Sequence, residues 1–175
     1  MFKVEAITPS IGAEISGVSL NKDLNSATVE KIYSALIKHQ VIFFRDQDIS
    51  PETHLKLAES LGDIDPGHPV YPHVEGYQSI VLLRNDVDNK PDTNDWHKDL
   101  TFKSNPPFAS ILHGINVPKV GGDTLWASMS AAYDSLPDGW KEHLEGLEAI
   151  HDMGTFRNDF YNEGGIDSVN SALKK

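Results

Sequence analysis

The series of short apolar segments after residue 78 constrains the fold most strongly. Strand-like segments are expected at 78–84, 96–102, 108–116, 124–127 and 147–151. Turn residues such as Asn105-Pro106-Pro107 and Gly121-Gly122 separate them. Closely spaced strands joined by proline and glycine turns are typical of a β-sandwich or jelly roll. The sequence therefore predicts a mainly β domain.

Helices are expected to flank this β region. Apolar residues recur with helical spacing over 27–39. Ser50-Pro51-Glu52 favours a second helix start, with a capping hydroxyl, a proline in the first turn and an acid near the positive end of the helix dipole. Two shorter helices are expected at 129–136 and 138–145. Because helices and strands do not alternate regularly, a doubly wound parallel sheet is less favoured.

Two further strands are expected before the second helix. Residues 11–18 alternate apolar with small or polar side chains, as in a half-buried strand, and Val41 to Phe44 form a continuous β-rich apolar run. Length and composition fit one domain over residues 1–175, with the last residues, 158–175, lacking an apolar pattern. Whether that domain forms a homo-oligomer is left open by the sequence.

Charge and cysteine content narrow the function. The chain has 15 Lys and Arg against 26 Asp and Glu, a formal net charge of −11. A negative surface repels phosphate, so neither nucleic acid nor an anionic membrane is an expected partner. The absence of cysteine excludes disulfides, thiolate metal sites and cysteine nucleophiles, and it fits a cytoplasmic location. We expect no signal peptide and no membrane span, because the apolar runs are only strand length.

The segment Trp96-His97-Lys98-Asp99 carries the most informative chemistry. Residues two apart on a strand point to the same face, so His97 and Asp99 are expected to converge. With one more histidine they would form the two-histidine, one-carboxylate face of non-haem Fe(II) oxygenases. A His-x-Asp pattern is common by chance, and an exposed pair on a strand edge is the alternative interpretation.

Five segments in one order resemble the taurine dioxygenase family of Fe(II)- and 2-oxoglutarate-dependent dioxygenases. They are Ile11-Gly12-Ala13-Glu14-Ile15-Ser16-Gly17, His39-Gln40-Val41-Ile42-Phe43-Phe44-Arg45-Asp46-Gln47, His68-Pro69-Val70-Tyr71-Pro72-His73, Trp96-His97-Lys98-Asp99 and Gly121-Gly122-Asp123-Thr124-Leu125-Trp126. The likeness runs from about Val4 to Phe156, leaving 158–175 a weakly matched tail. The resemblance implies a double-stranded β-helix, that is, a jelly roll, incomplete at its carboxy-terminal end.

The resemblance also implies roles for individual residues. His97 and Asp99 would bind Fe(II), and Thr124 would contact a carboxylate of the co-substrate 2-oxoglutarate. The family's reaction uses O₂ and 2-oxoglutarate and gives succinate and CO₂ while a substrate carbon is hydroxylated. Hydroxylation next to the sulfonate of a taurine-like substrate would release sulfite and an aldehyde. This chemistry belongs to sulfur metabolism.

Substrate contacts follow from the same resemblance. His68 and Tyr71 would donate to the sulfonate, as a ring N–H and a phenol can. Thr93 stands where relatives have an asparagine that helps to hold the substrate, which leaves two alternatives open: the amino end of the substrate is held differently, or the preferred substrate differs. Phe156 is the candidate for apolar packing on the substrate. The remaining histidines are read as core or surface residues, and His151 with Asp152 as structural.

The family's second iron histidine and its 2-oxoglutarate-binding arginine have no counterpart in this sequence. Two protein ligands hold Fe(II) weakly, and 2-oxoglutarate lacks its guanidinium anchor, so we expect little turnover from these 175 residues alone. Three alternatives stay open: a dioxygenase of alkyl sulfates, one of aryloxy-acids, and a non-catalytic fragment that needs a complementing chain. A structural zinc site is disfavoured because such sites normally have four protein ligands.

Overall fold

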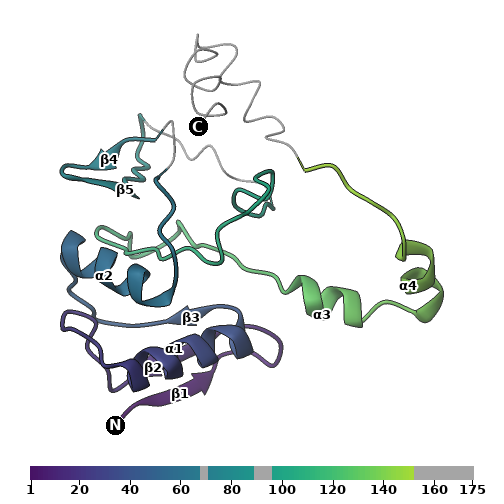
Figure 1. Cartoon of the computed structure of the whole chain (residues 1–175), viewed down its shortest axis with the longest axis horizontal. Coiled ribbons are helices and arrows are strands. Elements are labelled where there is room, and N and C mark those ends of the chain that lie inside the picture. The colour runs from purple at the N-terminus through teal and green to yellow at the C-terminus, as the bar shows by residue number, and fades with distance from the viewer. Residues whose placement is uncertain (68–70, 89–95, 152–175) are drawn as a thin grey trace. The chain divides into compact units, whose positions relative to one another are not determined.

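A computed structural model describes residues 1–67, 71–88 and 96–151 of the chain (Figure 1). The chain divides into two compact units. Unit 1 contains Met1–Leu61 and Ile111–Glu148, and unit 2 contains Gly62–Ser110 and the residues from Ala149 onward.

Unit 1 is built on a small mixed sheet in the order β1-β2-β3. Strand β1 (Lys3–Ala6) pairs antiparallel with β2 (Ala13–Ser16), and β2 pairs parallel with β3 (Ile42–Phe43). The register places Val4 opposite Ile15 and Ala6 opposite Ala13. Since Ala13 and Ile15 are buried, these four residues share the inner face of the sheet.

The two predicted helices of unit 1 form as the sequence indicated. Helix α1 (Ser26–His39) begins where the Asn25 side chain accepts a hydrogen bond from the Thr28 N–H at 2.9 Å, and it ends at Gln40, which has a φ of 65°. Helix α2 (Pro51–Leu61) follows Ser50, whose hydroxyl accepts from the Thr53 N–H at 3.2 Å. Local capping chemistry therefore fixes both starts.

The core of unit 1 is formed by residues of helices α1 and α2 and of the segments that precede these helices. Its buried residues are Leu20, Ile32, Ile49 and Leu57. Ile111, from the second stretch of the unit, packs against the same cluster. Beyond it lie two short helices, α3 (Met129–Asp134) and α4 (Asp138–Leu144), near the predicted positions. No helix among the described residues is both long enough and apolar enough to cross a membrane.

Unit 2 has one hairpin among its described residues. Strands β4 (His73–Val74) and β5 (Tyr77–Val81) pair antiparallel around a turn in which Gly76 has a φ of 80°. A positive φ at this place suits glycine. The strand expected at 78–84 is therefore present but shorter.

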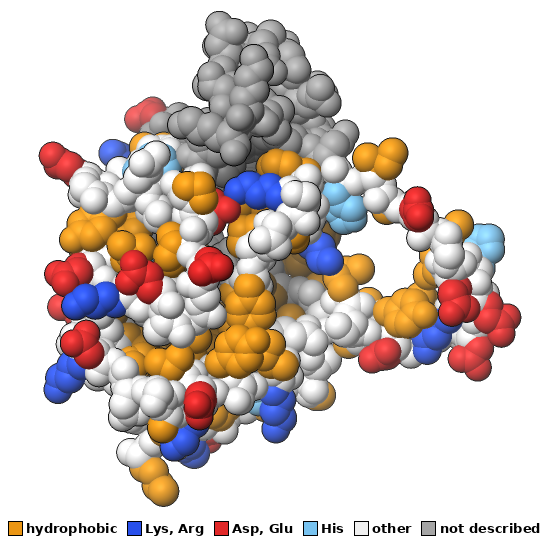
Figure 2. All heavy atoms as spheres, viewed as in Figure 1, with side chains coloured by type: hydrophobic (Ala, Val, Ile, Leu, Met, Phe, Trp, Pro, Cys, Tyr) orange, Lys and Arg blue, Asp and Glu red, His pale blue; other side chains and the backbone are white. Residues whose placement is uncertain are grey.

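Four expected strands are wrong in the described part of the chain: residues 96–102, 108–116, 124–127 and 147–151 are turns or irregular backbone. Many of their apolar side chains are exposed, including Ile115, Leu125 and Ile150, and Figure 2 shows hydrophobic side chains reaching the surface. A strand forms only when a neighbouring strand satisfies its backbone N–H and C=O groups, and none of the described strands pairs with these segments. The observed structure is thus small sheets with short helices, and the jelly roll stays an expectation.

Candidate functional site

His97 and Asp99 lie together in unit 2. The Nε2 atom of His97 is 3.4 Å from the Oδ1 atom of Asp99, and the side chains are 54% and 61% exposed. Their approach does not depend on a strand, because residues 96–98 are irregular and Asp99 begins a turn. The spacing of the two residues correctly predicted that their side chains converge, but the backbone expected for it was wrong.

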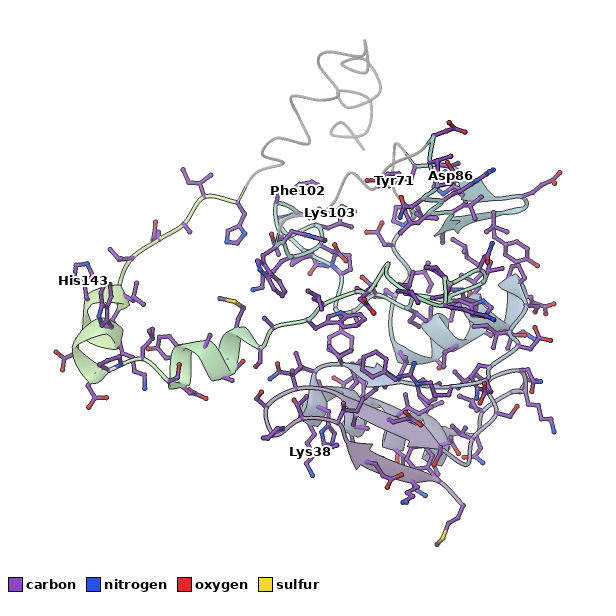
Figure 3. All side chains as sticks on the ribbon, turned by 180° about the vertical axis from the view of Figure 1, so that it is seen from behind. Lys38, Tyr71, Asp86, Phe102, Lys103 and His143 are labelled. Carbon is purple, nitrogen blue, oxygen red and sulfur yellow. The ribbon has the colours of Figure 1, made fainter. Side chains whose placement is uncertain are left out.

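The turn after Asp99 is held by local and distant contacts. Leu100 adopts a φ of 51°, an uncommon left-handed conformation for a residue with a Cβ, and its carbonyl accepts from the Lys103 N–H at 3.0 Å. The Lys103 ammonium donates to Asp65 Oδ2 at 2.6 Å, with both side chains about one-third exposed or less. Figure 3 labels Phe102 and Lys103 on this turn. Lys103 therefore ties the segment that carries Asp99 to the loop before β4.

A hydrogen bond from Ser110 orients the carboxylate of Asp99. The hydroxyl of Ser110 donates to Asp99 Oδ2 at 3.1 Å, while Oδ1 is the oxygen nearest the His97 ring. His151 reaches the same turn, with its Nδ1 atom 3.0 Å from the Thr101 hydroxyl. Neither Ser110 nor Lys103 carries a sequence signal for this role, because both contacts join residues far apart in the chain.

The donor pair fits a divalent metal ion. An imidazole nitrogen and a carboxylate oxygen are the donors that first-row divalent ions accept, and two such donors at right angles about 2.1 Å from an ion are about 3.0 Å apart. The observed 3.4 Å needs only a small adjustment. Among the described residues no group of three or more His, Cys, Asp or Glu side chains could hold a metal, so this part of the chain offers two donors at one place.

Thr124 lies in unit 1, on exposed irregular backbone after the Gly121-Gly122 turn. Both glycines have positive φ values, 77° and 71°, so the turn needs residues without a Cβ. Trp126 packs edge-on against Phe43 of β3, with ring centroids 5.3 Å apart and an interplanar angle of 79°. This aromatic contact anchors the Thr124 segment to the sheet of its own unit.

Of the four residues predicted to contact the substrate, one lies within the described part of the chain. Tyr71 is half-buried in unit 2 (Figure 3). His68, Thr93 and Phe156 lie outside the described residues. Their substrate roles stay predictions, as does that of Tyr71.

Sequence reasoning missed a histidine pair in unit 1. His54 of α2 lies with its Nε2 atom 3.2 Å from the Ile111 carbonyl oxygen, and its ring meets that of His113 edge-on at 6.3 Å. Burial lowers the pKa of the His54 imidazole, the Ile111 hydrogen bond opposes this shift, and the charge of His113 adds to it. No motif links these positions, so no sequence signal could have joined them.

Comparison with known proteins agrees with the donor chemistry. The family model described as "Taurine catabolism dioxygenase TauD, TfdA family" matches residues 3–172. The α-ketoglutarate-dependent sulfate ester dioxygenase of Pseudomonas putida is 42% identical over 149 residues, which cover 85% of this chain and 48% of that protein. The alkylsulfatase of Acinetobacter baylyi is 41% identical over 150 residues, covering 85% of this chain and 46% of that protein.

A solved structure shows the same likeness in three dimensions. A Burkholderia xenovorans protein, provisionally assigned as an α-ketoglutarate-dependent taurine dioxygenase, superposes with a TM-score of 0.78 at 37% identity. The match covers 87% of this chain and 54% of that structure. The chain thus spans about half the length of the relatives it matches.

An imidazole beside a carboxylate offers donors that a divalent metal ion accepts, and both the Pseudomonas putida relative and the Burkholderia xenovorans structure are described as α-ketoglutarate-dependent dioxygenases. The chain belongs to the taurine catabolism dioxygenase TauD/TfdA family. Members of this family are non-haem iron dioxygenases that use Fe(II), 2-oxoglutarate and O₂. The resemblance found in the five sequence segments is therefore confirmed.

Proposed function

We propose that this chain supplies His97 and Asp99 as two iron ligands of a 2-oxoglutarate-dependent dioxygenase that hydroxylates an alkyl carbon bearing a sulfur oxyanion. The observation that supports the proposal most is the approach of His97 Nε2 to Asp99 Oδ1 at 3.4 Å within a chain of this family. The oxyanion is a sulfonate or a sulfate ester, which present similar oxygens to a binding site. A cytoplasmic location belongs to the same proposal.

Each residue has a defined task. His97 would present a neutral ring nitrogen and Asp99 one carboxylate oxygen to Fe(II), while Ser110 holds the other oxygen of Asp99. Thr124 would donate its hydroxyl to a carboxylate of 2-oxoglutarate. When bound, the iron supplies O₂ activation coupled to decarboxylation of 2-oxoglutarate.

The substrate is held and distinguished by a second group of residues. His68 and Tyr71 would donate hydrogen bonds to the sulfur oxyanion, and Phe156 would pack on the alkyl part. Hydroxylation next to a sulfonate leaves an unstable adduct that releases sulfite and an aldehyde. Hydroxylation of the carbon that bears a sulfate ester releases sulfate and an aldehyde instead. The released anion therefore identifies the substrate type.

Metal titration tests the proposed ligands. Calorimetry with Mn(II), a redox-stable substitute for Fe(II), should detect weak one-to-one binding that His97→Ala or Asp99→Asn abolishes. Lys98→Ala is the matched control, because it changes the residue between them without removing a donor. Equal binding by all four proteins would show that the metal does not use this pair.

A substrate panel tests the substrate class. The protein is incubated at high concentration with Fe(II), ascorbate and 2-oxoglutarate, together with taurine, hexyl sulfate or phenoxyacetate, and succinate is measured with sulfite and sulfate. We expect little turnover, and what there is should depend on one of the two sulfur compounds. Succinate formation driven by phenoxyacetate alone would refute the substrate class, and robust turnover would refute the expectation of a weak site.

A further inference from the structure

Strand β1 is the outer strand of the unit 1 sheet. Its partner on one side is β2, and no described residue of unit 1 pairs with its other side. The Ile7 N–H bonds the Gly12 carbonyl at 2.9 Å, which continues the β1–β2 register. Because hydrogen bonding alternates along an antiparallel pair, the backbone N–H and C=O groups of Val4 and Ala6 point away from β2. These are the groups to which another strand would bind.

A groove runs beside this edge. It has a volume of about 540 Å³ and lies between β1 and α1. Its apolar lining is formed by Phe2, Val4, Ala27 and Ala35. Polar and charged side chains of α1 complete the lining, namely Glu30, Lys31, Ser34, Lys38 and His39, of which Figure 3 labels Lys38. A strand added to the edge of β1 would place every second side chain over this groove, because directly paired residues face the same side of a sheet.

The first three residues of β1, Lys3-Val4-Glu5, are complementary to themselves when reversed. In an antiparallel pair centred on Val4, Lys3 of one chain lies opposite Glu5 of the other, twice by symmetry. Val4 lies opposite Val4 as a hydrogen-bonded pair, so Lys3 and Glu5 occupy the flanking non-hydrogen-bonded pairs, where side chains come closest. In this one register the backbone groups of Val4 are hydrogen-bonded, Lys3 and Glu5 face opposite charges, and the Val4 side chains contact each other.

We propose that two copies of this chain associate through β1, forming a continuous sheet across a two-fold axis. Val4 of each copy enters the groove of the other, beside Ala35 and Phe2. Lys3 and Glu5, which are 2.8 Å apart within one chain and more than half exposed, join a four-charge network across the axis. An isologous contact of this kind closes on itself and does not extend into a fibre.

The charges single out a second copy over an unrelated strand. A formal net charge of −11 makes two copies repel each other, so association requires local attraction. The reversed Lys3–Glu5 pairing provides that attraction, whereas an uncharged strand lacks it and a strand with a base opposite Lys3 or an acid opposite Glu5 is repelled. Lysine on an exposed edge also discourages unspecific strand pairing.

Charge exchange tests the proposal by sedimentation velocity over a range of protein concentrations. The wild type should dimerise, and Lys3→Glu or Glu5→Lys should each weaken the dimer by about tenfold or more, because each brings like charges face to face. A mixture of the two variants should restore a heterodimer, since the two acidic side chains of one β1 strand then face the two basic side chains of the other. The double variant K3E/E5K should dimerise like the wild type.

Lys119→Glu is the control for net charge, since it alters the same kind of exposed residue away from β1. Circular dichroism of every variant establishes that the fold is retained. A wild type that stays monomeric overturns the proposal. Single variants that dimerise as well as the wild type, or a mixture that fails to associate, overturn it too.

Discussion

Ser110→Ala should weaken metal binding although it removes no metal ligand. The Ser110 hydroxyl donates to Asp99 Oδ2 at 3.1 Å, and this bond leaves Oδ1 toward His97. Without it the carboxylate can rotate, and part of the binding free energy is then spent on orienting it. The Ser110→Ala variant therefore separates the effect of orienting a metal ligand from the effect of removing one.

The exposure of Asp99 sets the expected size of the effect. Hydrogen-bond partners of metal ligands commonly contribute tenfold to hundredfold in affinity when they are buried. The Asp99 side chain is 61% exposed, so water can replace the lost hydroxyl in part. A net hydrogen bond of about 0.5–1.5 kcal/mol corresponds to an affinity loss of roughly twofold to twelvefold. We expect a value in that range, well short of the loss caused by His97→Ala.

Mn(II) calorimetry measures the effect, with Ser104→Ala as the matched control. Ser104 lies in the same unit and is exposed. Ser110 has no orienting role if Ser110→Ala binds Mn(II) as well as the wild type while Asp99→Asn does not. The same conclusion follows if Ser104→Ala loses as much affinity as Ser110→Ala.

Two further predictions concern unit 1. Ile32 is 1% exposed in the core, so Ile32→Ala should lower the free energy of unfolding by about 2–5 kcal/mol in urea titrations, whereas Ile37→Ala, 56% exposed on the same helix, should cost far less. The pKa of His54 is lowered in the folded state. Its contribution to the free energy of unfolding is therefore fully present above the ordinary pKa of 6.5 and is lost as the pH falls below that value. His54→Gln keeps a donor for the Ile111 carbonyl and should flatten this loss in urea midpoints measured across that pH, while His143→Gln on α4 should leave it; an unchanged loss in His54→Gln would contradict the assignment.

Local sequence signals predicted the helices of unit 1 well. The Asn25 and Ser50 caps and the helical spacing of apolar residues act within a few residues, so they can be read without knowing the rest of the fold. Strand β1 was missed because Lys3-Val4-Glu5-Ala6 is exposed throughout and carries no strong apolar pattern. The segments after residue 96 have strand composition, but composition cannot provide a neighbouring strand.

The candidate site was predictable only to the level of its two donors. Spacing brought His97 and Asp99 together, yet the actual geometry comes from a left-handed Leu100 and from the Lys103–Asp65 ion pair. Contacts between distant parts of the chain depend on the folded structure and leave no local pattern. Ser110 was therefore invisible to sequence reasoning, although it touches the carboxylate directly.

The division of unit 1 into two separate stretches has a consequence during synthesis. Ile111 packs on the core formed by Leu20, Ile32 and Leu57, but the ribosome must first make all of Gly62–Ser110. At about 5–20 residues per second this takes roughly 2–10 seconds. During that interval the nascent amino-terminal half exposes an apolar surface that its own chain cannot yet cover, so a ribosome-associated chaperone has a defined time in which to bind it.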